Sequence, residues 1–261
     1  MPNSTAATTA VSGVVAVLLL DYLPQHRAWG WMKLAQGAAA LGNPAGMRFA
    51  KIMGSGHGGG FSLRPSSTHQ GLITLFEQAD QAVDFLQGAH VEACRSRARQ
   101  SWSGVMSVTS AKGEWDGCSW DATPSESLGQ LQASPESIAS LPLAVLTRAS
   151  IRPAKALAFW RFAPAAQSDL GKAPGCQLAM GLGEAPLVRQ CTFSLWKDTR
   201  SMTSYAHQGA HQLAIAAAQR GNFFSESLFV RMRLLRQDGE WSGHAGQAAQ
   251  ANASTGQEPH G

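Results

Sequence analysis

The chain has 261 residues, of which 44% are apolar and 15% charged, and its formal net charge is +4. This length allows one large domain or two small ones. The basic residues are scattered rather than gathered into a stripe with interleaved aromatic residues, so we do not expect nucleic-acid binding. So low a charge content indicates a globular protein with an unusually apolar surface, or one that handles an apolar partner.

Both ends of the chain have compositions typical of disorder. Residues 1–11 are rich in Ser, Thr and Ala, and residues 244–261 hold almost no large apolar side chain. Neither segment can bury enough surface to offset the entropy of ordering, so we predict two disordered tails.

The apolar run from Val11 to Leu20 is too short to span a bilayer, which takes about 20 residues. No Lys or Arg precedes this run, as a signal peptide would require. We therefore interpret it as a buried strand and expect a cytoplasmic protein.

Several short anchors occur twice along the chain, in the same order. Trp31 and Trp160 precede Gly46 and Gly175 by the same number of residues. The other repeated anchors are FAKIMGSG at 49–56 with LAMGLGEA at 178–185, Gly-Ala-His at 88–90 and 209–211, and GEWDG at 113–117 with GEWSG at 239–243. Such a series of ordered matches predicts a duplicated unit.

Each half predicts the same series of elements: a strand, a helix, two strands, a second helix and a last strand. In the first half these are Val14–Leu20, 28–41, 46–53, 69–76, 78–97 and 103–111. In the second half they are Leu143–Leu146, 152–168, 175–182, 187–196, 198–220 and 225–236. This βαββαβ order is that of the ferredoxin-like fold.

A ferredoxin-like sheet has one face covered by its helices and leaves the other bare and apolar, where a tandem copy can cover it. We therefore predict the α+β class, with tandem duplicated ferredoxin-like βαββαβ units that form a pseudo-symmetric α/β barrel. The predicted units are residues 12–117 and 140–243. Residues 118–139, which are rich in Ser, Pro, Glu and Gln, are the predicted linker, and residues 1–11 and 244–261 are the tails.

The halves differ first in a glycine-rich loop. The sequence GSGHGGGFSLRPSSTHQ at 54–70 makes this part of the first half longer than its counterpart. It lacks the Gly-Lys-Ser/Thr ending of a P-loop. Since glycine permits positive φ and close backbone approach, the loop is either a hairpin connection or a ligand-contacting wall, with Phe61 and Arg64 as its contact side chains.

The halves differ again in the second long helix. After the shared Gly-Ala-His, the first half carries Glu92, Arg95, Arg97 and Arg99, so much of that helix must face water. The second half has no polar side chain from Leu213 to Ala218, and most of these residues are alanine. A helix that is apolar nearly all round is buried or lies against something large and flat.

His211 begins this alanine-rich segment, and Ile215 lies one turn further on the same face. From spacing alone, His211 is a hydrogen-bonded core histidine, a capping residue or a metal ligand. His207, four residues earlier, could join it on zinc, but HExxH is absent. A single histidine facing an alanine-lined space suits haem better, because haem needs one proximal ligand and a broad apolar slot.

Other catalytic signatures are missing from the sequence. No Gly-x-Ser-x-Gly elbow supports a hydrolase triad, and no Gly-x-Gly-x-x-Gly opens a helix after a strand for a dinucleotide. The cysteines have no CxxC or CxxCH spacing, so structural zinc and c-type haem attachment lack support and we expect free thiols.

Three segments resemble the spheroidene monooxygenase family: MRFAKIMGSGHGGGFSLRP at 47–65, the stretch 186–235 that begins PLVRQCTFSLWKD, and the closing GEWSG. The resemblance covers most of 13–243. It implies a haem protein of the dimeric α/β-barrel type that acts in purple-bacterial carotenoid biosynthesis. Such enzymes use O2 and electrons from reduced ferredoxin to oxidise the C2 position of spheroidene-type carotenoids to a ketone, by two hydroxylations.

The resemblance also implies the haem ligand. The family's Tyr-Ala-x-x-Gly-x-His segment falls on Tyr205, Ala206, Gly209 and His211. His211 is therefore the implied proximal iron ligand in the second unit, with His207 as the second choice. His90, the counterpart of His211 in the first half, lies on a helix too polar to floor a haem pocket.

Three alternatives stay open at this point. The chain could be a haem enzyme of the same fold with dehydratase or peroxidase chemistry, a haem- or carotenoid-binding protein without turnover, or a barrel with no cofactor. The partners that the resemblance implies are a carotenoid substrate and a ferredoxin-type reductant. Homo-oligomerisation and peripheral contact with the inner membrane are also left open.

Overall fold

The computed structural model describes residues 9–60, 62, 64–131, 135–161, 170–185, 187–207 and 220–242. The strands in that part of the chain are β1 (Thr9–Val11), β2 (Val14–Tyr22), β3 (Met47–Gly56), β4 (Pro65–Phe76), β5 (Ala98–Trp115), β6 (Cys118–Trp120), β7 (Leu143–Ile151), β8 (Cys176–Ala185), β9 (Arg189–Trp196) and β10 (Phe224–Glu240). The α-helices are α1 (Arg27–Gln36), α2 (Ala79–Gln87), α3 (Ala89–Arg95), α4 (Pro135–Ser140), α5 (Ala156–Phe159) and α7 (Thr199–Ala206). The 3-10 helices are η1 (Pro24–His26), η2 (Gly37–Leu41), η3 (His57–Gly59), η4 (Ser125–Leu131) and η5 (Pro153–Lys155).

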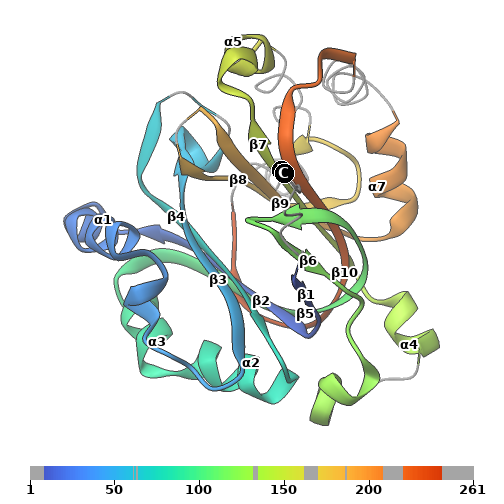
Figure 1. Ribbon diagram of the computed structural model, residues 1–261. Helices are drawn as coiled ribbons and strands as arrows, with labels where there is room; N and C mark the ends of the chain where they lie inside the picture. The colour runs from blue at the N-terminus through green and yellow to red at the C-terminus, as the bar shows by residue number, and fades with distance from the viewer. Residues whose placement is uncertain are drawn as a thin grey trace, which may run out of the picture.

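Each half of the chain forms an antiparallel sheet with the same strand order. The first sheet runs β3-β4-β2-β5, and the second runs β8-β9-β7-β10. The helices lie on the outer sides of the sheets (Figure 1). The predicted tandem ferredoxin-like units are therefore confirmed.

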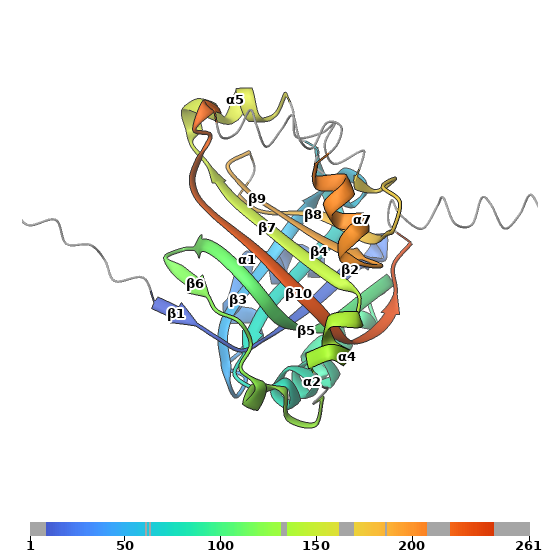
Figure 2. The same ribbon diagram turned by 90° about the vertical axis from the view of Figure 1, so that its right-hand side faces the viewer.

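The two sheets close on each other into a barrel of eight strands. β5 and β10, the last strand of each unit, pair along most of their length, and Figure 2 shows them side by side with β7. At the other seam, β3 and β8 pair through Gly54 and Gly183. Because this seam has a single pair of residues in register, side chains of the two units contact each other around it.

Apolar side chains from both units fill the barrel interior. On β2, Val15, Val17 and Leu19 point inward, whereas Val14 and Leu18 point outward beneath helices. Side chains alternate across a strand, so a strand that is buried on both faces has a continuous apolar sequence. This arrangement confirms that the apolar run near the N-terminus contains a buried strand.

Helices α2 and α3 cover the outer face of the first sheet, with Phe85 and Val91 buried against it. The structure differs here from the single helix predicted over 78–97, because the chain breaks at Gly88, whose backbone is extended (φ −73°, ψ 162°). Glycine is a poor helix former, so it ends α2 and begins α3 at little cost.

Helix α7 covers part of the outer face of the second sheet. The Asp198 carboxylate caps it by accepting the Ser201 N–H at 2.7 Å, and Met202 packs with Leu143 and Trp196. The helix predicted over 198–220 thus begins as expected, while residues 208–219 lie outside the described residues. No helix in the described part of the chain is long and apolar enough to cross a membrane.

The ends of the first unit differ from the predictions. Residues 9–11, predicted to belong to a disordered tail, form β1, which pairs in parallel with β6 inside the predicted linker. β6 is held there because Trp120 is buried and its ring meets the edge of Phe49 at 5.4 Å. The remaining bounds of the two units stay predictions.

Candidate functional site

At one level of the sheets, the outer face of the second sheet carries smaller side chains than the outer face of the first. In the first sheet, Ile52, Leu72 and Leu18 form one row across β3, β4 and β2. The row at the same register of the second sheet is Gly181, Thr192 and Thr147, across β8, β9 and β7.

The leucines of the first row are also more buried than the threonines of the second. Leu18 and Leu72 are buried beneath the helices of the first unit. Thr147 is exposed and Thr192 is half-buried. Two threonines and a glycine therefore occupy less volume at this level than the three branched aliphatic residues of the first sheet.

The adjacent row repeats this contrast. A Cβ built on Gly54 would lie 3.4 Å from the side chain of Leu34 on α1. A Cβ on its counterpart Gly183 would meet the neighbouring strand, with Arg189 O at 3.4 Å and the Gln190 side chain at 3.7 Å. Helix α1 therefore packs onto the first sheet at a place where the described helices of the second unit do not.

We call this surface the threonine face; Thr147 is exposed in it, Thr192 and Gly183 are half-buried, and Gly181, Ala149 and Gln190 are buried. Aromatic side chains border it. Phe229, 37% exposed, pairs in register with Thr147 on one side, and Tyr205 of α7 packs on Trp196 at 5.4 Å on another. Short side chains with a few hydroxyls inside an aromatic rim suit a broad, flat and largely apolar ligand.

Most of the residues predicted to bind a cofactor lie outside the described residues, namely His211, Ile215 and Phe61. His207 ends α7, where its side chain is exposed and its backbone N–H donates to Thr203 O at 3.2 Å. Within the described ranges, no group of three or more His, Cys, Asp or Glu side chains is arranged to hold a metal ion.

Arg64 closes the glycine-rich loop through its backbone. Its carbonyl accepts the His57 N–H at 2.8 Å, while its side chain is exposed. Gly58 and Gly59 have φ angles of 68° and 79°, which favour glycine, and a Cβ on Gly56 would lie 2.2 Å from a carbonyl oxygen. The loop therefore has a tightly specified shape, and its η3 turn contacts β8 at the edge of the threonine face.

A buried serine bridges the seam between the units. The Ser55 hydroxyl donates to Gly181 O at 2.5 Å across the β3–β8 seam.

The four cysteines are free, as predicted. Burial raises the pKa of the Cys176 thiol to about 12, so that thiol is protonated at neutral pH.

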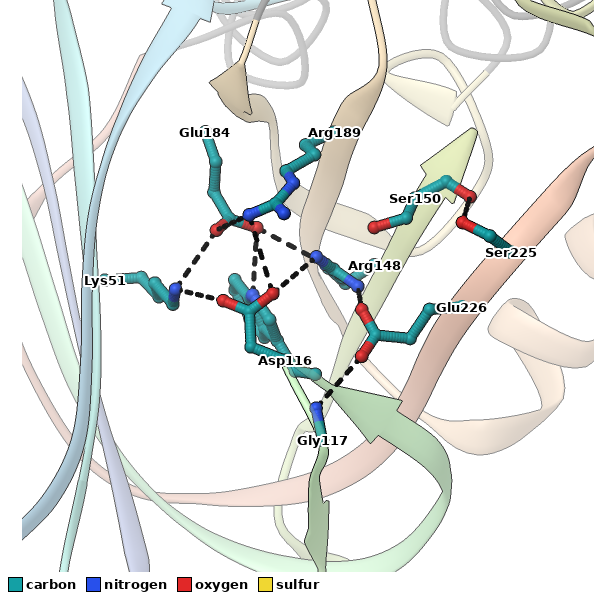
Figure 3. Close-up of polar contacts among 10 residues, drawn as sticks. Lys51, Asp116, Gly117, Arg148, Ser150, Glu184, Arg189, Ser225 and Glu226 are labelled. Carbon is teal, nitrogen blue, oxygen red and sulfur yellow. Dashed lines mark hydrogen bonds and ion pairs between the residues drawn. The ribbon is translucent and has the colours of Figure 1, made fainter. Parts of the chain in front are cut away.

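A cluster of charged side chains closes one end of the barrel interior (Figure 3). Arg148 on β7 is its centre, with a side chain that is 0% exposed. Arg148 Nε donates to Glu184 Oε1 at 3.3 Å and Nη2 donates to Asp116 Oδ1 at 3.3 Å, while Nη1 bonds Glu226. The planar guanidinium can serve three carboxylates at once because its five N–H donors point outward in a fork.

The remaining cations complete the charge balance of this cluster. Lys51 Nζ bonds Asp116 and lies 3.2 Å from Glu184 Oε2. Arg189 Nη1 lies 3.5 Å from Asp116 Oδ1. Since Lys51 and Asp116 come from the first unit and the others from the second, the cluster fixes the two units relative to each other.

The protonation states follow from these contacts. Burial acts to raise the pKa of Asp116, but the hydrogen-bonded Lys51, together with Arg148 and Arg189, outweighs it and holds that pKa below its usual value. Burial acts to lower the pKa of Lys51, but Asp116 and Glu184 hold it above its usual value. Both groups are therefore charged at neutral pH, and the paired charges stabilise structure rather than offer a reactive group.

Sequence reasoning missed the threonine face and the cluster. The threonine face was detectable by aligning FAKIMGSG with LAMGLGEA, which sets Ile52 against Gly181. The cluster carried a weaker signal, because its members come from distant segments and stand at positions such as Arg148, where the strand pattern predicts an inward apolar residue.

Arg148→Met tests the cluster. Removal of the central cation leaves Asp116, Glu184 and Glu226 close together with too little positive charge, so the free energy of unfolding at pH 7 should fall by about 3–5 kcal/mol. Urea denaturation followed by tryptophan fluorescence measures this loss.

The loss caused by Arg148→Met should shrink as the pH falls toward the ordinary Asp pKa of 3.8. Arg148 is one of the cations that hold the Asp116 pKa down, so the wild type loses the contribution of Asp116 as this carboxylate is protonated, whereas the variant has less of that contribution to lose. Adding Glu226→Gln should recover part of the loss. An equal loss in the exposed control Arg236→Met would contradict the role of the cluster.

The chain has relatives among curated proteins. It is 44% identical to the spheroidene monooxygenase of Rubrivivax gelatinosus over 238 residues, which are 90% of this chain and 88% of that protein. It is 33% identical to the spheroidene monooxygenase of Rhodobacter capsulatus over 199 residues, 76% of this chain and 79% of that protein. No protein-family model matches the chain.

A solved structure shares the fold. The crystal structure of an aldoxime dehydratase superposes with a TM-score of 0.54 at 10% sequence identity, over 85% of this chain and 81% of that one. At this identity the likeness concerns the fold alone. The two curated relatives match at higher identity over most of both lengths, and the chain therefore belongs to the spheroidene monooxygenase family.

Proposed function

We propose that the protein is a haem-dependent monooxygenase that oxidises the C2 position of acyclic carotenoids, in the manner of spheroidene to spheroidenone. It incorporates oxygen from O2 and takes electrons from reduced ferredoxin. Its relatives are named for spheroidene oxidation, which supports the substrate class. The structural observation that carries the proposal is the threonine face, whose side chains are shorter than those at the same register of the first unit.

The residues of the threonine face fit a flat, largely apolar group such as haem. Gly181, Thr192 and Thr147 are short, so they leave room for a group that lies parallel to the sheet. In the first unit, the buried Leu18 and Leu72 occupy the same level. A broad slot with small walls is what haem requires of a protein, so the second unit is the better host.

His211 is the proposed iron ligand. In the first unit its sequence counterpart, His90, lies on α3, which buries Val91 and Cys94 against the sheet. The pseudo-symmetry of the units supports an iron site on the corresponding side of the second sheet. Exposed His207, at the end of α7, is the second choice.

Three further residues are proposed as haem contacts. Ile215 is one helical turn from His211 in sequence. Phe61 and Arg64 belong to the glycine-rich loop, whose η3 turn contacts β8 beside the threonine face. Their assignment follows from that neighbourhood and from the shape that the loop's glycines fix.

Haem, when bound, supplies the oxygen activation that amino-acid side chains lack. The chain binds and orients the reactants. The exposed ring of Phe229 offers apolar surface to a polyene. The hydroxyls of Thr147 and Thr192 face the same space and can donate hydrogen bonds to a polar atom of a bound molecule.

Substitution of the two histidines tests the ligand assignment. The purified wild type should show a Soret band, and His211→Ala should lose most of it because the iron then has no protein imidazole. His207→Ala, the matched control, should keep the band. A band that persists in His211→Ala, or that disappears in His207→Ala alone, would contradict the assignment. Ketone formation from spheroidene with reduced ferredoxin, measured on the wild type, separates an enzyme from a binding protein.

Thr192→Leu tests the threonine face, because it reproduces the Leu72 of the first unit. The added side chain should clash with a flat ligand and raise the dissociation constant for haem by about tenfold or more, with little change in melting temperature. Leu72→Thr is the mirror control: it should cost about 2–4 kcal/mol of stability and leave haem binding by the folded protein unchanged. Unchanged haem affinity in Thr192→Leu would refute this placement.

A further inference from the structure

We propose that one end of the second unit docks on an anionic lipid bilayer through two exposed leucines. The docking tip consists of residues 152–161, which include α5, together with residues 187–189 and 220–224. α5 lies at the top of Figure 2, beyond the ends of β7 and β10. The proposal stands on the surface itself and does not require that haem binds.

Two leucines of the tip project into solvent. Leu157 on α5 is 75% exposed, and Leu187 in the turn between β8 and β9 is 46% exposed. Leu187 also has a φ of 70°, in the left-handed region where glycine or asparagine is favoured over a bulky residue. A leucine that is both exposed and conformationally disfavoured indicates a role outside the fold.

A hydrogen bond and aromatic contacts join the two segments that carry these leucines. Trp160 Nε1–H donates to the Leu187 carbonyl at 2.9 Å and so joins α5 to the turn. Behind them, the Phe159 ring meets Trp160 at 5.7 Å and Phe224 at 6.0 Å, both edge to face. Aromatic residues just beneath projecting aliphatic side chains are typical of surfaces that sit at a membrane interface.

The docking tip is positively charged, which favours an anionic partner. Its described segments carry no Asp or Glu and five cations: Arg152, Lys155, Arg161, Arg189 and Arg220. Arg189 is paired with Asp116, while among the described residues no ion pair involves the other four, which can meet an external anion. A second copy of the chain would bring like charges together, whereas a bilayer with anionic headgroups satisfies cations and leucines at once.

The docking tip lies next to one end of the threonine face. β7 ends at Ile151, directly before the tip, and the row of Ala149, Gln190 and Gly183 is the end of the threonine face nearest to it. A long apolar molecule dissolved in the bilayer would thus meet the protein beside the face without first crossing water. An apolar substrate makes such an approach more favourable than diffusion through solvent.

Vesicle sedimentation with the full-length purified protein tests the proposal. The wild type should pellet with vesicles of equal phosphatidylglycerol and phosphatidylcholine and bind pure phosphatidylcholine much more weakly. Leu157→Ser/Leu187→Ser should weaken binding by about tenfold or more, because each leucine loses its apolar insertion. Lys155→Glu/Arg161→Glu should weaken it by at least about 25-fold, since each cation near an anionic surface contributes about fivefold.

Matched controls locate the effect. Met32 on α1 is 46% exposed, as Leu187 is, and Met32→Ser should bind like the wild type. Lys112→Glu/Lys172→Glu makes the same charge change at exposed sites away from the tip and should have a much smaller effect. Circular dichroism checks that each variant is folded.

Two results would overturn the proposal: no binding of wild type to anionic vesicles, or equal losses in the tip variants and their controls. The first would leave an acidic protein as the partner of the tip, and the second would assign binding to overall charge. Ketone formation from detergent-dispersed spheroidene, measured separately, tests the proposed function. That activity should survive the tip substitutions, so the failure of one proposal is distinguishable from the failure of the other.

Discussion

The mutual burial of the two inner sheet faces is the constraint on which the rest of the structure depends. A single ferredoxin-like sheet would expose Val15, Val17 and Leu19 on one side, with their neighbours, and could not persist in water. Facing its own copy, it buries them in a shared core. The long β5–β10 pairing and the Arg148 cluster then hold the copies in one arrangement, one by backbone bonds and the other by charge.

Because the inner faces hold the barrel together, the outer faces are free to differ. The first unit fills its outer face with leucines, isoleucine and covering helices, and so gains stability. The second unit places Gly181, Thr192 and Thr147 at the same level and gives up that packing. Duplication thus allows one copy to be the scaffold while the other is free to hold a ligand, which is why we propose a site in only one of the two similar units.

The fold could be predicted in outline because repeated anchors and strand periodicity are local signals. The break at Gly88 and the strand at Thr9–Val11 were missed, since they depend on what packs against them. The site was harder. The alanine-rich segment and His211 were visible in the sequence, but the threonine face needs strand register, and the pairing of Arg148 with Glu226 needs barrel closure, neither of which sequence spacing contains.

The measurement that tests the account most directly is the position of iron, found by anomalous X-ray scattering at the iron edge from crystals of haem-loaded protein. The account predicts one iron over the outer face of the second sheet, closer to Thr192 than to its counterpart Leu72. Iron inside the barrel, or over the outer face of the first sheet, would contradict it, as would fully active crystals that contain no iron.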